Sequence, residues 1–211
     1  MKVKSFGCSF IYGNELSDDK TGRTPSKLSW PALVAQHFGA EYQCFACPGS
    51  GNLQIYNELC QQIDDQDTIY IIGWTFIDRF DYLDPLTDKW NTLLPNTTSR
   101  YSEFYYKNFH SQYRDKLQTL SLIHSSILAL KNKKAIITTV DSLVWETDWH
   151  SNPGIKILQD QVKDNVVSFN GLGFLDWSRS NNWPVSQLNH PLDYAHKSAA
   201  DYILKLGINK I

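Results

Sequence analysis

The first feature of the sequence that could do chemistry is a serine close to the N-terminus. Ser9 lies between Gly7 and Gly13 in the segment MKVKSFGCSFIYG. A short apolar run predicts a first strand over residues 2–6, so Ser9 follows the end of that strand. Open α/β sheets keep their sites just past the carboxyl ends of their strands, and glycines let the backbone turn sharply there. Ser9 is therefore a candidate nucleophile, although the same residues are typical of an ordinary turn.

A serine hydroxyl becomes a useful nucleophile only when a base takes its proton. Two of the six histidines, His190 and His196, lie where the last helix is expected to start, in HPLDYAHKSAADYI. Pro191 leaves His190 in a loop or cap position, from which its side chain can reach the edge of the sheet. His196 lies about 9 Å further along a helix axis, so both cannot reach one hydroxyl. His190 is the predicted general base.

The elements that must position these residues alternate between strand and helix. Apolar, β-branched and aromatic runs predict strands over residues 2–6, 42–47, 67–73, 134–140 and, briefly, 166–169, with a closing helix over residues 190–206. Right-handed crossovers bring the carboxyl ends of parallel strands to one edge. We expect one domain over residues 1–211, a flavodoxin-like three-layer α/β/α sandwich with a central five-stranded parallel sheet.

One segment interrupts this alternation. Residues 76–110 lack clear periodicity, are rich in aromatic residues and read as an insertion. A connection of this length is usually functional or forms a lid. Because flat aromatic faces stack on sugar rings, tryptophans that follow strand ends are candidate substrate contacts: Trp74, Trp145 and Trp149. It is equally reasonable that the aromatic rings pack a small core of the lid itself.

Composition excludes several classes of partner. The net charge of −2 gives no electrostatic reason to expect nucleic acid or an anionic membrane surface as a partner. No apolar run is long enough to span a bilayer, and the N-terminal residues lack the apolar core of a signal peptide, so we expect a cytoplasmic protein. Cys44 and Cys47 form a C-x-x-C pair within an apparent strand, without a second ligand pair for zinc. The four cysteines are therefore predicted to be buried, reduced thiols, and no metal site is expected.

Four short blocks in chain order resemble those of the SGNH (GDSL-like) hydrolases, and together they span nearly the whole chain. The blocks are Gly7-Cys8-Ser9, the turn around Gly49, Gly73-Trp74-Thr75, and His190-Pro191. The resemblance implies that Ser9 is the nucleophile and His190 the general base. It also implies an oxyanion hole built from the backbone N–H groups of Ser9 and Gly49 and the side chain at position 75. No cofactor is implied.

The sequence departs from this family pattern at two positions. Thr75 stands where the family has an oxyanion asparagine, and a threonine hydroxyl donates from a shorter side chain. Gln187 stands where the family has an aspartate, three residues before the catalytic histidine. Either the site is a Ser–His dyad whose histidine is oriented by a carbonyl or amide, or another acid, such as Asp176, substitutes.

The resemblance implies a serine esterase that hydrolyses small acyl esters, with O-acetyl groups on carbohydrate as one candidate substrate. The alternative is a non-catalytic carbohydrate-binding relative, in which the absence of the aspartate and the asparagine reflects the loss of catalytic activity. A flavodoxin-like nucleotide binder is a third hypothesis. It is disfavoured because the loop after the first strand lacks a glycine run and has no basic residue before Lys20.

Overall fold

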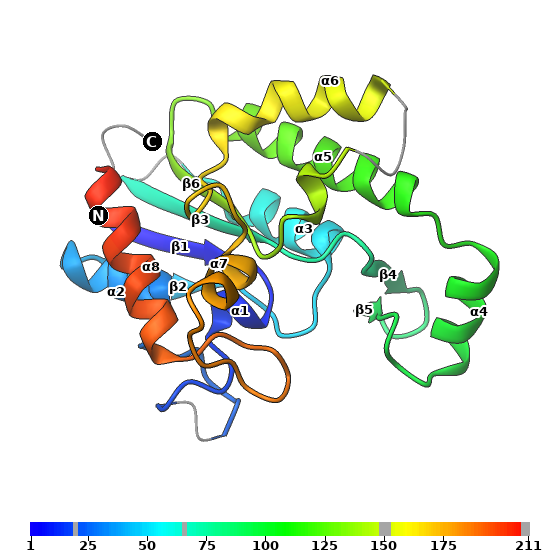
Figure 1. Ribbon diagram of the computed structural model, residues 1–211, viewed down its shortest axis with the longest axis horizontal. Helices are drawn as coiled ribbons and strands as arrows, with labels where there is room; N and C mark the ends of the chain where they lie inside the picture. The colour runs from blue at the N-terminus through cyan, green and yellow to red at the C-terminus, as the bar shows by residue number, and fades with distance from the viewer. Residues whose placement is uncertain (19–20, 65–66, 148–152, 208–211) are drawn as a thin grey trace.

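The structure, a computed structural model, describes residues 1–18, 21–64, 67–147 and 153–207. Its central sheet has four parallel strands in the order β2-β1-β3-β6 (Figure 1). The strands are β1 (Lys2–Phe6), β2 (Glu41–Cys44), β3 (Thr68–Trp74) and β6 (Lys134–Thr139). In register, Val3 pairs with Tyr42 on one side and with Ile69 on the other. The predicted parallel α/β sheet is confirmed, with four strands where five were predicted.

The predicted fifth strand at residues 166–169 is reduced to a single bridge. Val166 pairs in parallel with Ile137, and the N–H of Val167 donates to the Ile137 carbonyl at 2.7 Å. The chain then leaves the sheet edge, because Phe169 closes a tight turn with Leu172 through reciprocal backbone hydrogen bonds. The Phe169 side chain is wholly buried, so packing competes successfully with further strand pairing.

Helices cover both faces of the sheet, and β3 shows why. Ile69 and Ile71 belong to a core cluster with helices α2 (Trp30–His37) and α8 (Asp193–Leu206). Tyr70 and Ile72 point to the opposite face and belong to a second cluster. That face is covered by α3 (Asn52–Gln62), α5 (Gln112–Ala129) and α6 (Pro153–Val162) (Figure 1). Alternate residues of a strand buried on both faces produce the continuous apolar run seen in the sequence, and the three-layer prediction is confirmed.

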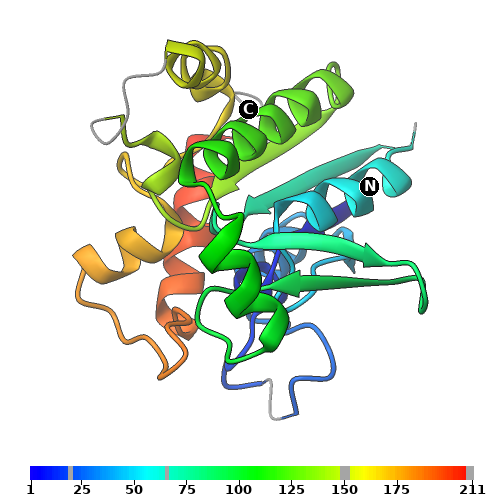
Figure 2. The same cartoon turned by 90° about the vertical axis from the view of Figure 1, so that its right-hand side faces the viewer.

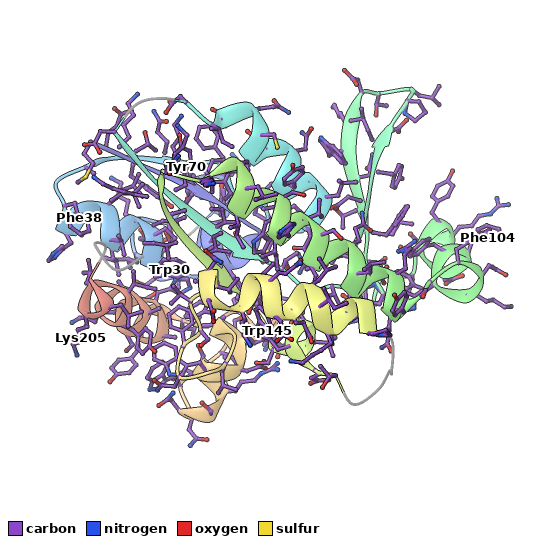
Figure 3. All side chains as sticks on the ribbon, turned by 90° about the horizontal axis from the view of Figure 1, so that it is seen from above. Trp30, Phe38, Tyr70, Phe104, Trp145 and Lys205 are labelled. Atoms are coloured by element: carbon purple, nitrogen blue, oxygen red, sulfur yellow. The ribbon has the colours of Figure 1, made fainter. Side chains whose placement is uncertain are left out.

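The insertion at residues 76–110 contains regular structure that periodicity did not reveal. It forms the antiparallel hairpin β4 (Phe80–Asp84) and β5 (Lys89–Leu93), followed by α4 (Arg100–Asn108) (Figure 2). The Phe80 and Tyr105 rings stack with their centroids 4.3 Å apart, which joins the hairpin to α4. Several of the aromatic residues therefore pack a small core of the insertion. Phe104, in contrast, is exposed on the outer side of α4 (Figure 3).

Two further boundaries differ from the sequence prediction. Between the strand predicted at residues 166–169 and the predicted closing helix, the chain forms α7 (Phe174–Ser180), which is too short to show a clear period in the sequence. The closing helix α8 begins at Asp193, three residues after His190. The remaining elements are the one-turn helix α1 (Ser9–Tyr12) and two 3-10 turns, η1 (Leu143–Trp145) and η2 (Lys163–Asn165).

Two sequence expectations concern burial and membranes. Cys8 is buried, whereas Cys47 and Cys60 are exposed, so the prediction of four buried thiols is wrong for these two residues. Cys47 lies in the turn after β2 and Cys60 on the exposed side of α3, while Cys44, at the end of β2, is half-buried.

Within the described ranges, none of the helices combines the length and apolar character needed to cross a bilayer.

Candidate active site

Ser9 is the first residue of α1, which begins immediately after the turn at the end of β1. Two glycines let this helix approach the sheet closely. A Cβ atom on Gly7 would lie 2.4 Å from the Ile11 side chain, and one on Gly73 would lie 2.5 Å from the same side chain. Ile11 therefore packs over the end of β1 and over β3, and this packing holds Ser9 at the carboxyl edge of the sheet.

The Ser9 hydroxyl is paired with a histidine from the far end of the chain. The distance between Ser9 Oγ and His190 Nε2 is 2.9 Å. His190 lies in a loop whose ends are joined by the bridge between Val185 and Pro191, just before α8. The edge of the His190 ring meets the Phe10 ring, with the centroids 5.3 Å apart. This is the pairing of nucleophile and base that acyl transfer requires.

The group that orients His190 is Glu15, which sequence reasoning missed. Glu15 Oε2 lies 2.5 Å from His190 Nδ1 and 2.5 Å from Ser186 Oγ. The hydroxyl of Ser186 donates to the carboxylate and also accepts the N–H of His190 at 3.1 Å. Ser9, His190 and Glu15 therefore form a hydrogen-bonded triad with Ser186 behind it.

Neither of the two groups suggested by the sequence holds the imidazole. The Asp176 carboxylate accepts the N–H of Ser142, in the segment after β6, at 2.7 Å. Gln187 is exposed on the wall of a cleft beside His190. Within the described ranges, the hydrogen bonds of the His190 ring go to Ser9 and Glu15. The prediction of Gln187 or Asp176 in this role is corrected to Glu15.

Local backbone geometry explains why a residue so close to the nucleophile can reach behind its base. α1 ends at Gly13 in the left-handed conformation (φ 82°), and Glu15 is itself left-handed (φ 65°), so the chain doubles back after one helical turn. The N–H of Ser17 then donates to Asp193 at 3.0 Å, which ties the loop to the start of α8. The only feature of the sequence that could have indicated this role of Glu15 is that a carboxylate occurs in the polar segment shortly after Ser9.

The electrostatics favour an ionised carboxylate. The hydrogen bond from Ser186 is the largest influence and lowers the pKa of Glu15 below its usual value. Desolvation opposes this effect, and the hydrogen bond and charge of His190 lower the pKa further. The carboxylate is then available to keep the proton of His190 on Nδ1 and to stabilise the imidazolium.

His196 has a structural role. It is buried, and its Nδ1 accepts the backbone N–H of Trp30 at 3.1 Å, at the first residue of α2. Burial lowers the pKa of His196 to about 3, so the ring stays neutral at ordinary pH. His190, and not His196, is the histidine at Ser9.

The residues expected in the oxyanion hole lie on loops that other side chains fix. Gly49 has φ 86°, a conformation that favours glycine, in the turn after β2. Ser50 anchors that turn by donating to the Cys47 carbonyl at 2.7 Å. Thr75 is buried, and its Oγ1 has no hydrogen-bond partner among the described residues. A buried hydroxyl without a partner is costly, and a ligand oxygen would relieve that cost.

Two residues that sequence reasoning did not identify hold these loops. Asn52 Oδ1 accepts the N–H of Thr75 at 2.8 Å, and its Nδ2 donates to the Thr75 carbonyl at 3.2 Å. Asp81, on the hairpin, accepts the N–H groups of Gly51 and Gln54, both at 2.9 Å. The insertion thus caps the start of α3 and fixes the turn that carries Gly49.

Of the three tryptophans proposed as substrate contacts, the two that the structure describes belong to, or pack against, the second core cluster. Trp74 is wholly buried in the second core cluster, so its ring offers no face to a ligand. Trp145 packs against the same cluster, beside α6 (Figure 3). Trp149 lies outside the described residues. Trp74 and Trp145 therefore contribute to the packing of the core.

A cleft with a volume of about 580 Å³ lies beside the triad. His190 lines it together with Phe10 and Phe76, the residues that follow Ser9 and Thr75 in the chain. Its other apolar and charged lining residues are Leu94, Pro95, Leu175, Leu188, Asp78, Arg79 and Arg179. The His190 ring is thus reached from this side.

Solved structures similar to this chain are esterases and lipolytic proteins. A member of the lipolytic G-D-S-L family from Veillonella parvula is 12% identical, with a TM-score of 0.55 and 98% of each chain covered. Phospholipase A1 from Streptomyces albidoflavus is 10% identical, with a TM-score of 0.52 over 97% of this chain and 98% of that chain. A carbohydrate esterase family 2 enzyme from Corynascus thermopiles (Myceliophthora fergusii) is 11% identical, with a TM-score of 0.53 over 99% of this chain and 66% of that one.

The identities are low, and the similarity therefore concerns the fold. The sequence matches no protein-family model, and it matches no curated protein. The chain has the fold of the SGNH (GDSL-like) hydrolases, as the four sequence blocks predicted.

Proposed function

We propose that this protein is a serine esterase that hydrolyses small acyl esters through a Ser9–His190–Glu15 triad. The observation that carries the proposal is the continuous hydrogen-bonded chain from Glu15 through His190 to Ser9. The esterases and lipolytic proteins among the structures that share the fold are consistent with it.

The reaction begins when His190 Nε2 takes the proton of Ser9 Oγ, which attacks the carbonyl carbon of the ester. The charge that develops on the carbonyl oxygen is received by the N–H groups of Ser9 and Gly49 and by the hydroxyl of Thr75. Collapse of the tetrahedral intermediate breaks the ester C–O bond, and His190 gives its proton to the leaving alcohol. Water then attacks the acyl-serine with His190 again as base, releasing the acid and regenerating Ser9.

The substrate class follows from the cleft and from the similar structures. The cleft has room for a small acyl ester beside His190. One of the similar proteins is named as a carbohydrate esterase, which supports O-acetyl groups on carbohydrate as a candidate substrate. The alternative of a non-catalytic carbohydrate-binding relative was argued from a missing aspartate and a missing oxyanion asparagine. Glu15 supplies a carboxylate at His190 and so weakens the first argument, whereas Thr75 still stands in place of the asparagine.

Labelling with a fluorophosphonate probe tests the proposal, because such a probe forms a covalent bond only with an activated serine. We expect labelling of the wild-type protein, with the adduct mapped to Ser9 by mass spectrometry, and none in Ser9→Ala. The control is Ser121→Ala, which removes an exposed hydroxyl on α5 and should label like the wild type. A folded wild-type protein that takes up no label would refute the proposal.

A further inference from the structure

The cleft beside His190 lies where the alcohol part of an ester must bind. The same imidazole that takes the proton from Ser9 returns it to the leaving oxygen, so the leaving group has to lie next to His190 Nε2. His190 lines the cleft, whereas Ser9, Gly49 and Thr75 do not. The oxyanion and acyl parts of a substrate therefore lie toward the loops after β1, β2 and β3, and the alcohol part extends into the cleft.

Two arginines from separate elements line this cleft. Arg79 follows β3, and its guanidinium is held by a hydrogen bond to the Ser50 carbonyl at 2.8 Å and by the Phe76 ring below it, 5.1 Å from the centroid. Arg179 projects from α7 and donates to Asn189 Oδ1 at 2.9 Å. A guanidinium carries five N–H donors, so one such hydrogen bond positions each side chain and leaves donors for a ligand.

The charges around the cleft are not balanced by its own acidic residues. Asp78 is the single carboxylate among the described residues that line it, and Arg79 is the charge that acts most strongly on Asp78. Burial raises the pKa of Asp78, and the charge of Arg79 opposes that shift. The guanidinium of Arg179 stays unmatched by any carboxylate that lines the cleft. A guanidinium in this position suits a planar carboxylate or a phosphate, which it can bind through two parallel hydrogen bonds.

We propose that the enzyme prefers esters whose alcohol part carries an anionic group, and that Arg179, with Arg79, binds this group in the cleft. The proposal rests on the proposed esterase function. For acylated carbohydrate, it points to esters of acidic sugars over esters of neutral ones. Arg179 would then be a residue that determines specificity.

Two esters that differ by one charge test the proposal. The kcat/KM of the wild-type enzyme for 4-acetoxybenzoate is compared with its kcat/KM for 4-acetoxybenzamide, in low salt. A hydrogen-bonded ion pair predicts a preference of about tenfold for the carboxylate. A third ester, 4-acetoxyphenyl phosphate, distinguishes phosphate from carboxylate as the preferred anion. A preference for either one supports the proposal.

The variant that tests the residue is Arg179→Gln, because Arg79 also holds the turn of Ser50. We expect the ratio of the two kcat/KM values to fall several-fold toward one in Arg179→Gln. Arg23→Gln removes the same charge from an exposed loop away from the cleft and should keep the wild-type ratio. Equal hydrolysis of all three esters by the wild type would overturn the inference while leaving the esterase function intact. Absence of both hydrolysis and fluorophosphonate labelling would instead refute the proposed function.

Discussion

Glu15 and His190 are separated by 175 positions in the chain, yet Glu15 Oε2 and His190 Nδ1 are 2.5 Å apart. The acid comes from the loop that follows the nucleophile, and the base comes from the loop before the last helix. The sequence position expected to supply the acid holds Gln187, which lines the cleft instead. The sequence left open a Ser–His dyad or a triad with a substitute acid, and the contact between Glu15 and His190 forms a triad with an acid that was not among the candidates.

Glu15→Gln keeps the shape of the side chain but removes its charge, so the imidazolium formed during catalysis loses its stabilisation. We expect kcat for p-nitrophenyl acetate to fall by a factor on the order of 10⁴. Glu103→Gln, an exposed change on α4, and Asp176→Asn, at the candidate the structure places elsewhere, should each retain most of the activity. Loss of activity in Asp176→Asn with full activity in Glu15→Gln would reverse the assignment of the acid.

Ser9→Ala and His190→Ala remove the nucleophile and the base. Each should lower kcat by a factor on the order of 10⁴ or more, and the double variant should be little worse than either single one, because the two act as a unit. Stopped assays with p-nitrophenyl acetate measure the rates, and circular dichroism confirms that the variants are folded. Full activity in either folded single variant would contradict the mechanism.

Thr75→Val replaces the hydroxyl with a methyl group of similar shape. Because the hydroxyl is proposed to act on the developing oxyanion, kcat should fall by about 10²-fold or more while KM changes little. Thr75→Asn, which brings the side chain expected from the SGNH pattern, should retain more activity than Thr75→Val if residue 75 can reach the oxyanion. An unchanged kcat in Thr75→Val would mean that Thr75 only packs the loop.

His196 should make the protein less stable in mild acid. Its pKa is about 3 in the folded protein against 6.5 for the free group, so below pH 6.5 the unfolded chain binds a proton that the folded protein does not. The contribution of the neutral His196 ring to the free energy of unfolding is therefore fully present above pH 6.5 and is lost as the pH falls toward 3. At pH 5 the loss amounts to about 2 kcal/mol of unfolding free energy.

Urea unfolding of the wild type and of His196→Asn at pH 7.5 and pH 5 measures this effect. We expect the wild type to lose more stability than the variant between the two pH values, since asparagine has no proton to bind. His37→Asn, a change on the exposed face of α2, is the matched control and should behave like the wild type. Equal losses in wild type and His196→Asn would show that the buried ring is not the cause.

The sequence alone determined the parallel α/β architecture, because strand patterns such as the β-branched and aromatic run at residues 67–73 alternate along the chain with helical patterns. It also pointed to Ser9 and His190, through the end of the first strand, the proline before the last helix and the resemblance of four blocks to the SGNH hydrolases. Each of these patterns is local in the sequence. The topology of a parallel sheet brings the two residues to the same edge, where they become neighbours.

Only the tertiary structure decided which acid completes the site and what the aromatic residues do. Glu15 reaches His190 because two left-handed residues, Gly13 and Glu15, reverse the chain, and Asp193 ties the returning loop to α8. Side-chain spacing in the sequence carries no information about such a reversal. Likewise, Trp74 looks like a surface residue at a strand end, but the packing of the second core cluster buries it completely. Whether a residue is buried depends on which segments pack against it. Those contacts join parts of the chain that are far apart in the sequence.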